Sequence, residues 1–306
     1  MGPRVPPLGF IGLGAMGGAV VDRLLGAGAD VFVHDVDGGK VRAFAEKGAK
    51  ACASAGGVGG FAEIVFGCLP SGDACLETVS QLPGNDEKGA GIYVELSTIG
   101  RPAIARIERM LSSRGIALVD APLSGGPRGA RAGTLSSMVA GDEAALERVR
   151  PVLDLIGNRV FYIGRTPGQA QLMKLVNNLI SGANMAAAFE ALVIGAKAGL
   201  DAQTMVDVIN ASTGRNSATE DKIPASVLDG SFDYGATIAV LDKDISLGLE
   251  EAMALGVPTL ALSGVARLWA RAVEQGGAAA DFTSLITYVE KPAGAVVRRK
   301  SDGRIG

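Results

Sequence analysis

The chain has 306 residues, which exceeds the usual size of a single hydrophobic core and favours two domains. Its 32 acidic and 29 basic residues give a formal charge of -3, so no basic field is available to hold nucleic acid or an anionic membrane. The three cysteines lack paired ligand spacing and the chain has one histidine, which predicts buried free thiols and no metal site.

The amino terminus reaches a glycine-rich turn after about ten residues, too soon to hold the apolar core of a secretory signal. We therefore expect an intracellular, cytoplasmic protein.

Between residues 8 and 164, short β-rich runs alternate with helical patterns, at 8–11, 31–34, 64–68, 92–96 and 116–119. Only helical crossovers return the chain to begin another parallel strand, so the alternation predicts a mostly parallel sheet, which the runs at 137–140 and 160–163 would extend.

A glycine-rich turn follows the first strand and opens the first helix. It consists of Gly12, Leu13, Gly14, Ala15, Met16 and Gly17. Backbone N–H groups at such a turn can meet a pyrophosphate, with glycine where a side chain would block its approach. Asp35 ends the second strand at the spacing expected for a carboxylate that binds the adenosine ribose. The turn and Asp35 together predict a Rossmann-type dinucleotide-binding domain over residues 1–167 that prefers NAD to NADP, because Asp35 would repel the NADP phosphate.

The segment after the strand at 116–119 contains Ser124, Gly125 and Gly126. Ligands bind at the carboxyl ends of strands in open parallel sheets. A serine hydroxyl with two glycine N–H groups can hold a carboxylate without adding a charge. A loop whose glycines serve only its turns is the structural alternative.

The pattern from Gln169 to Ala198 predicts one helix of about 45 Å, long enough to pass between domains. Lys174 and Asn178 are four residues apart and therefore share a face of it, although a lysine in an apolar helix is most often a surface residue. Charged residues interrupt the longest apolar stretch, 179–200, so no membrane span is expected. The sequence after this long helix also shows helical patterns. We expect an all-α domain over residues 168–292, joined to the first by the long helix, and a frayed tail over 293–306.

These segments together resemble the 3-hydroxyacid (β-hydroxyacid) dehydrogenase family, in particular 3-hydroxyisobutyrate dehydrogenases. The resemblance extends over residues 8–290. The motifs that carry it are the glycine turn, Leu69-Pro70, Ser97-Thr98-Ile99, Ser124-Gly125-Gly126, the segment from Lys174 to Asn178, and Lys243-Asp244.

The resemblance implies an NAD-dependent oxidoreductase that transfers a hydride between the nicotinamide and a small 3-hydroxy carboxylic acid. Lys174 would be the catalytic acid and base, Ser124, Gly125, Gly126 and Asn178 would hold the substrate, and Asp244 would lie near the lysine. Leu69, Pro70, Thr98 and Lys243 would line the cofactor.

Two residues depart from the family pattern. Ala170 stands where a second glycine is common, and Ala236 where a phenylalanine often closes the substrate pocket. The loss of that ring would enlarge the pocket, so we do not infer a preference for the smallest acids.

Three alternatives stay open. They are a catalytically inactive nucleotide-binding regulatory protein, a relative of the imine reductases, which typically lack the lysine, and a phosphogluconate dehydrogenase, which has histidine where this chain has Asn177. The apolar helices of the second half predict a homodimer or homotetramer.

Overall fold

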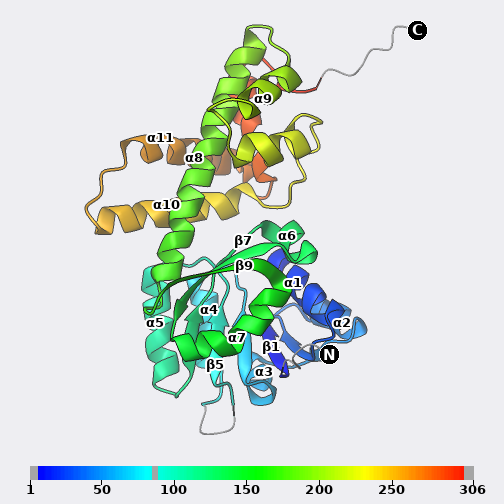
Figure 1. The fold of residues 1–306 in the computed structure, drawn as a ribbon, viewed down its shortest axis with the longest axis vertical. Coiled ribbons are helices and arrows are strands. Elements are labelled where there is room, and N and C mark those ends of the chain that lie inside the picture. Colours follow the sequence, from blue (N-terminus) through cyan, green and yellow to red (C-terminus); the bar gives the residue numbers. More distant parts are fainter. Residues whose placement is uncertain (1–5, 85–88, 300–306) are drawn as a thin grey trace. The chain divides into compact units, whose positions relative to one another are not determined.

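A computed structural model describes residues 6–84 and 89–299. The chain forms two compact units, residues 1–174 and 175–306 (Figure 1). The long helix α8 (Gln169–Lys197) begins in the first unit and continues into the second.

The first unit is built on a nine-stranded sheet with the order β3-β2-β1-β4-β5-β6-β8-β7, and β9 also pairs with β8. The pairings from β3 through β6 are parallel, while β8 is antiparallel to β6 and β7. The strands are β1 (Leu8–Ile11), β2 (Val31–His34), β3 (Lys50–Ala51), β4 (Ile64–Gly67), β5 (Ile92–Glu95), β6 (Ala117–Asp120), β7 (Leu123–Ser124), β8 (Leu135–Gly141) and β9 (Gly157–Gly164). The predicted mostly parallel sheet is confirmed, and β1 lies between β2 and β4, where the strand order reverses and parallel sheets bind their ligands.

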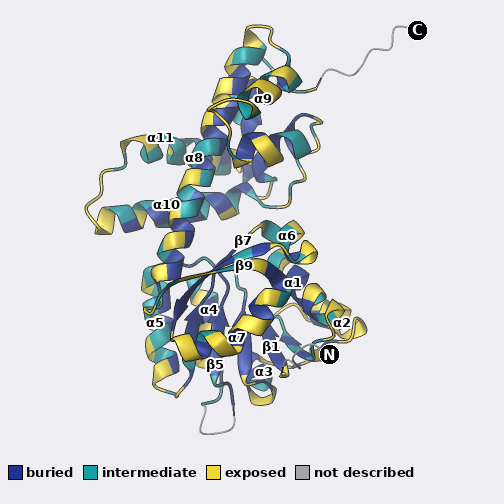
Figure 2. Ribbon diagram, in the orientation of Figure 1, coloured by how far each residue is buried: buried dark blue, intermediate teal, exposed yellow. Residues whose placement is uncertain are grey.

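Both faces of this sheet are buried, because alternate side chains of each strand enter different hydrophobic clusters. Phe10 and Phe66 pack in one cluster, whereas Ile11 and Val65 pack in the other. Burial on both faces explains why these strands are nearly continuous apolar runs in the sequence. Figure 2 shows the central strands of the sheet as mostly buried, whereas β9 and the outer surfaces of the surrounding helices carry exposed residues.

Four of the connecting helices begin at polar caps. The side chains of Asp37, Ser54, Ser71 and Asp142 each accept a hydrogen bond from a backbone N–H in the first turn of their helix. The helices of this unit are α1 (Ala15–Gly26), α2 (Gly38–Glu46), α3 (Ala55–Phe61), α4 (Gly72–Ser80), α5 (Arg101–Ser112), α6 (Gly126–Ala132) and α7 (Glu143–Ile156).

The second unit is helical, as predicted. After α8 it contains α9 (Ala202–Asn210), the π-helical segment η2 (Ala218–Val227), α10 (Ile238–Ala254), α11 (Leu260–Ala272), the short turns η3 (Val273–Gly277) and η4 (Phe282–Ile286), and α12 (Thr287–Ala293). Its core surrounds Trp269 and Phe189, both fully buried. Asp201 and Asp281 cap α9 and η4 through their carboxylates.

By length and composition alone, α8 is long and apolar enough to cross a membrane. This differs from the sequence-based expectation, which weighed the charged residues at its end. The first turns of α8 carry the polar residues Gln171, Lys174 and Asn178, all of them buried within the protein. The core helix of a soluble protein can meet the same criterion of length and composition.

The segment after α12 differs from the predicted frayed tail over its described part. Val297 is fully buried, and its N–H donates to the carboxylate of Glu290, 2.7 Å away. The guanidinium of Arg298 pairs with the same carboxylate, and the N–H of Arg299 donates to the carbonyl of Leu228. Residues 294–299 are therefore fixed to the second unit, whereas residues 300–306 lie outside the described part of the chain.

Candidate active site

The glycine turn joins the end of β1 to the start of α1. Gly12 has a φ of +97°, and a Cβ there would lie 2.2 Å from the carbonyl oxygen of Cys68. A Cβ at Gly17 would lie 2.0 Å from the carbonyl oxygen of Gly12, so both positions require glycine. Gly14 caps α1, and a Cβ added there would meet no atom within 4 Å. The amino end of α1 thus faces open space, which fits a bound pyrophosphate.

Asp35 lies directly beside this turn. Its carboxylate accepts hydrogen bonds from the backbone N–H of Leu13 at 2.7 Å and of Asp37 at 2.8 Å, and Lys40 lies 3.6 Å away. Burial raises the pKa of the carboxyl, but the N–H groups of Asp37 and Leu13 and the Lys40 ammonium outweigh it and hold the pKa below its usual range. Asp35 is therefore a charged acceptor next to the glycine turn.

The segments after β4 and β5 contact each other through Ser97, whose hydroxyl accepts the N–H of Leu69 at 2.7 Å. The N–H of Ser97 donates in turn to Glu95, whose carboxylate also accepts the hydroxyl of Tyr93. Glu95 is fully buried, and this burial raises its pKa to about 7 although the hydrogen bonds from Ser97 oppose the rise. The positions of Leu69 and Thr98 thus depend on a buried network that sequence reasoning did not identify.

The bend predicted to hold a carboxylate starts at Ser124, which pairs with Ser136 at the end of β7. Gly125 and Gly126 have φ of +124° and +63°, and they connect the strand directly to α6. These backbone angles are unfavourable for residues with a side chain, so the bend needs both glycines.

Lys174 lies in the second turn of α8 and is only 8% exposed. The first turn of the helix is fixed by Asp120, at the end of β6, whose carboxylate accepts the N–H of Gly168 at 2.8 Å. Burial raises the pKa of Asp120 to about 6, against the hydrogen bonds from Gln171 and Gly168 that lower it. A buried lysine is rare in proteins, so this environment departs from that of an ordinary surface lysine.

One turn further along α8, Asn178 donates from Nδ2 to Asp244 of α10 over 2.6 Å. The other oxygen of this carboxylate accepts the Nζ of Lys243 at 2.7 Å. Asp244 is 3% exposed, so Lys243 and Asp244 are more than a charged pair on a helix surface. The structure brings these three predicted residues together within the second unit.

Sequence reasoning assigned no role to Glu95, Ser97, Asp120 or Gln171, although Ser97 lies in the motif Ser97-Thr98-Ile99. Glu95 and Asp120 each end an apolar strand, and a carboxylate at that place was a usable signal. Nothing in the spacing of Gln171 could have indicated its contacts, because they join it to residues more than 50 positions away.

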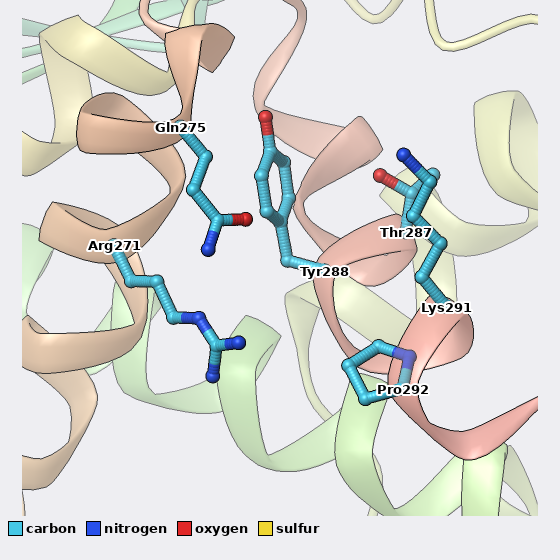
Figure 3. A pocket seen from close by; sticks show the side chains of 6 residues that line it. All are labelled: Arg271, Gln275, Thr287, Tyr288, Lys291 and Pro292. Carbon is cyan, nitrogen blue, oxygen red and sulfur yellow. The ribbon is translucent and has the colours of Figure 1, made fainter.

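Two surface cavities lie away from all of these residues. One of about 250 Å³ belongs to the second unit, where Arg271 and Gln275 face Tyr288 and Lys291 (Figure 3). The other, of about 390 Å³, lies beside Phe61 and Glu63. Cys52, Cys68 and Cys75 are free thiols, as predicted; Cys52 and Cys75 are buried as expected, whereas Cys68 is half-buried.

Two family models match consecutive parts of the chain. Residues 7–164 match the NAD binding domain of 6-phosphogluconate dehydrogenase, and residues 168–289 match the model described as NAD-binding of NADP-dependent 3-hydroxyisobutyrate dehydrogenase.

Individual relatives match over nearly the whole length. A 2-(hydroxymethyl)glutarate dehydrogenase of Eubacterium barkeri is 35% identical over 95% of this chain and 97% of its own. A 3-hydroxyisobutyrate dehydrogenase of Pseudomonas aeruginosa is 34% identical over 82% of this chain and 87% of its own. Among solved structures, the Mycobacterium tuberculosis 3-hydroxyisobutyrate dehydrogenase with L-serine superposes with a TM-score of 0.83 at 29% identity, over 93% of this chain and 99% of that one.

Proposed function

Because this chain belongs to the family of 3-hydroxyisobutyrate dehydrogenases and related hydroxyacid dehydrogenases, we propose that it oxidises or forms a small 3-hydroxy carboxylic acid with NAD and Lys174. The observation that carries the proposal is the burial of Lys174 in the second turn of α8, one turn away from the anchored residue Gln171. A lysine held in this way is suited to proton transfer, which requires a fixed donor and acceptor.

In the oxidising direction, NAD supplies the acceptor for the hydride that leaves the carbon of the alcohol. Lys174 takes the hydroxyl proton at Nζ, so the carbonyl product forms without a free alkoxide. In reduction the same ammonium returns its proton to the oxygen. The hydroxyl of Ser124 and the N–H groups of Gly125 and Gly126 would bind the acid group, and Asn178, held by Asp244, would orient the substrate.

NAD rather than NADP is supported by the charge of Asp35 beside the glycine turn. Two unit charges about 4 Å apart repel by roughly 1 to 4 kcal/mol in effective dielectrics of 80 down to 20. Lys40 opposes this effect in part, because it lies 3.6 Å from the same carboxylate.

The substrate class extends beyond the smallest acids. Ala236 is half-buried beside Phe282 in the second unit, and it stands where a pocket-closing phenylalanine is common in the family. The relative from Eubacterium barkeri is named for an acid with a second carboxylate arm. We therefore propose to compare 2-(hydroxymethyl)glutarate with 3-hydroxyisobutyrate, serine and glycerate as substrates.

An inactive nucleotide-binding protein and an imine reductase are less well supported. The relatives that match along the whole chain are named as hydroxyacid dehydrogenases, and Lys174 is retained and buried. We also propose that the second unit assembles as a homodimer or homotetramer.

The direct test measures reduced nicotinamide formation with NAD and NADP over the acids named above, for the wild type and for Lys174→Ala. Removal of a general base typically slows turnover by about 10² to 10⁴-fold, and NAD affinity should be unchanged because other segments hold the nucleotide. Lys197→Ala, at the exposed far end of the same helix, is the matched control. Full turnover in Lys174→Ala would assign the proton transfer to another group, and no turnover of any acid by the wild type would remove the proposal.

A further inference from the structure

Gln171 uses every hydrogen-bonding position of its side-chain amide. Oε1 accepts the backbone N–H of Ile99 at 2.8 Å and of Gly100 at 3.1 Å. Nε2 donates to the carbonyl of Ser97 at 3.0 Å and to Oδ1 of Asp120 at 2.8 Å. Gln171 is fully buried, so none of these bonds exchanges with water.

The carboxylate of Asp120 holds the backbone of the same turn of α8. Oδ2 accepts the N–H of Gly168 at 2.8 Å and that of Gln171 at 3.2 Å. The carboxylate and the amide therefore fix the first turn of α8 both through its main chain and through its one fully buried polar side chain. Both residues belong to the first unit, as does Lys174.

The contacts of Gln171 join three segments. The loop 97–100 carries Thr98, Asp120 begins the segment that leads to Ser124, and α8 carries Lys174 three residues after Gln171. In a rigid helix the Cα atoms of residues 171 and 174 are separated by about 4.5 Å along the axis, so a shift of one moves the other.

We propose that Gln171, paired with Asp120, is a positioning residue that holds the Lys174 turn of α8 in register with the Ser97–Gly100 loop and the segment that leads to Ser124. This deepens the proposed function and rests on it, because positioning matters only if Lys174 transfers the proton. A displacement of about 1 Å in such a site can slow the reaction about 10²-fold.

The pattern of donors and acceptors distinguishes this role from ordinary packing. Gln171→Glu keeps the shape and still accepts from Ile99 and Gly100, but it places a carboxylate against Asp120 and the carbonyl of Ser97. Asp120→Asn puts a second donor against Nε2 of Gln171. In the double variant, the new amide at position 120 can keep its oxygen for the backbone N–H groups and donate to the new carboxylate at position 171. Only the contact with Ser97 then stays mismatched.

The test is a double-variant cycle measured by single-turnover stopped flow, with NAD and the acid that the wild type oxidises fastest. We expect Gln171→Glu and Asp120→Asn each to lower the rate constant of hydride transfer at least about tenfold, and the double variant to be faster than Gln171→Glu alone. A loss of folded protein would lower the amplitude of the transient and leave its rate constant unchanged.

Gln169→Glu is the matched control, because Gln169 lies in the same turn, is exposed, and only accepts the N–H of Thr166, which a glutamate also can do. Its rate constant should equal that of the wild type. Wild-type rate constants in both single variants, or a double variant slower than either, would overturn the positioning role while the dehydrogenase function stands. A wild type that oxidises no acid would instead remove the proposed function, and the positioning role with it.

Discussion

At the scale of single residues, three carboxylates at strand ends differ in the direction of their pKa shifts. Glu95 and Asp120 are register partners at the ends of β5 and β6, both fully buried, and burial raises their pKa values to about 7 and about 6. Asp35, at the end of β2, has its pKa lowered, because two backbone N–H groups and Lys40 outweigh its partial burial. Location alone therefore does not set the charge, and the local donors decide it.

Glu95→Gln should reduce the loss of stability that the protein shows as the pH rises through neutrality. The folded-state pKa of Glu95 lies above the ordinary pKa of 4.5 for a glutamate. The stabilisation by its proton is therefore fully present below about pH 4.5 and is lost as the pH rises through about 7. The full loss is on the order of 3 kcal/mol. A glutamine can still accept the N–H of Ser97 and contact the Tyr93 hydroxyl.

Urea unfolding of both proteins at pH 5.5 and pH 8.5 gives the measurement, as the difference in unfolding free energy between variant and wild type. Asp120 titrates in both proteins and so cancels from this comparison. If the difference is the same at both pH values, Glu95 is not the titrating group.

Asp35→Ala should shift the cofactor preference towards NADP. The substitution removes the charge that repels a 2′-phosphate and leaves Lys40 able to approach it. The repulsion of roughly 1 to 4 kcal/mol corresponds to a rise of about fivefold or more in the ratio of kcat/KM for NADP to that for NAD. Asp30→Asn, an exposed carboxylate beside β2 that pairs with Lys50, is the control. An unchanged ratio would show that Asp35 does not contact the ribose.

At the scale of elements, the sequence predicted the parallel strands β1, β2, β4, β5 and β6 to within a residue, because burial on both faces makes each of them a continuous apolar run. The two-residue strands β3 and β7 were missed, since pairing with β2 and β8 defines them and no local pattern does. The tail was predicted to be frayed because the sequence after residue 292, which includes Val297 and Arg298, shows little hydrophobic periodicity. Their contacts with Glu290 are tertiary and have no local signal.

The candidate site, like the fold, could be predicted only in part from the sequence. The glycine turn and Asp35 have fixed spacing on consecutive elements, so sequence alone predicted them. Lys174 and Asn178 could be placed on one helix face, but their roles came from the resemblance to a family. Gln171 gave no signal, because its partners lie at the ends of two other strands and only folding brings them to α8.

At the scale of the whole molecule, the connection between α10 and α11 exposes a cluster of apolar side chains. Met253 is 78% exposed and Leu260 93%, with Leu255 and Val257 each more than half exposed between them. Figure 2 shows most of this connection as exposed. If the chain assembles with copies of itself, as we propose, these exposed apolar side chains are where we expect the contact.

Met253→Lys combined with Leu260→Lys should therefore lower the molar mass of the protein in solution, because like charges buried in a contact between copies would lose their hydration without a partner. Light scattering after size-exclusion chromatography measures the mass directly. Phe61→Lys is the control, since Phe61 is also exposed but lies in the first unit, at the end of α3. A wild type of higher mass than one chain, converted to a smaller species by the double substitution and not by the control, would locate the contact at the connection between α10 and α11. Equal mass in all three proteins would show that Met253 and Leu260 do not lie in a contact between copies.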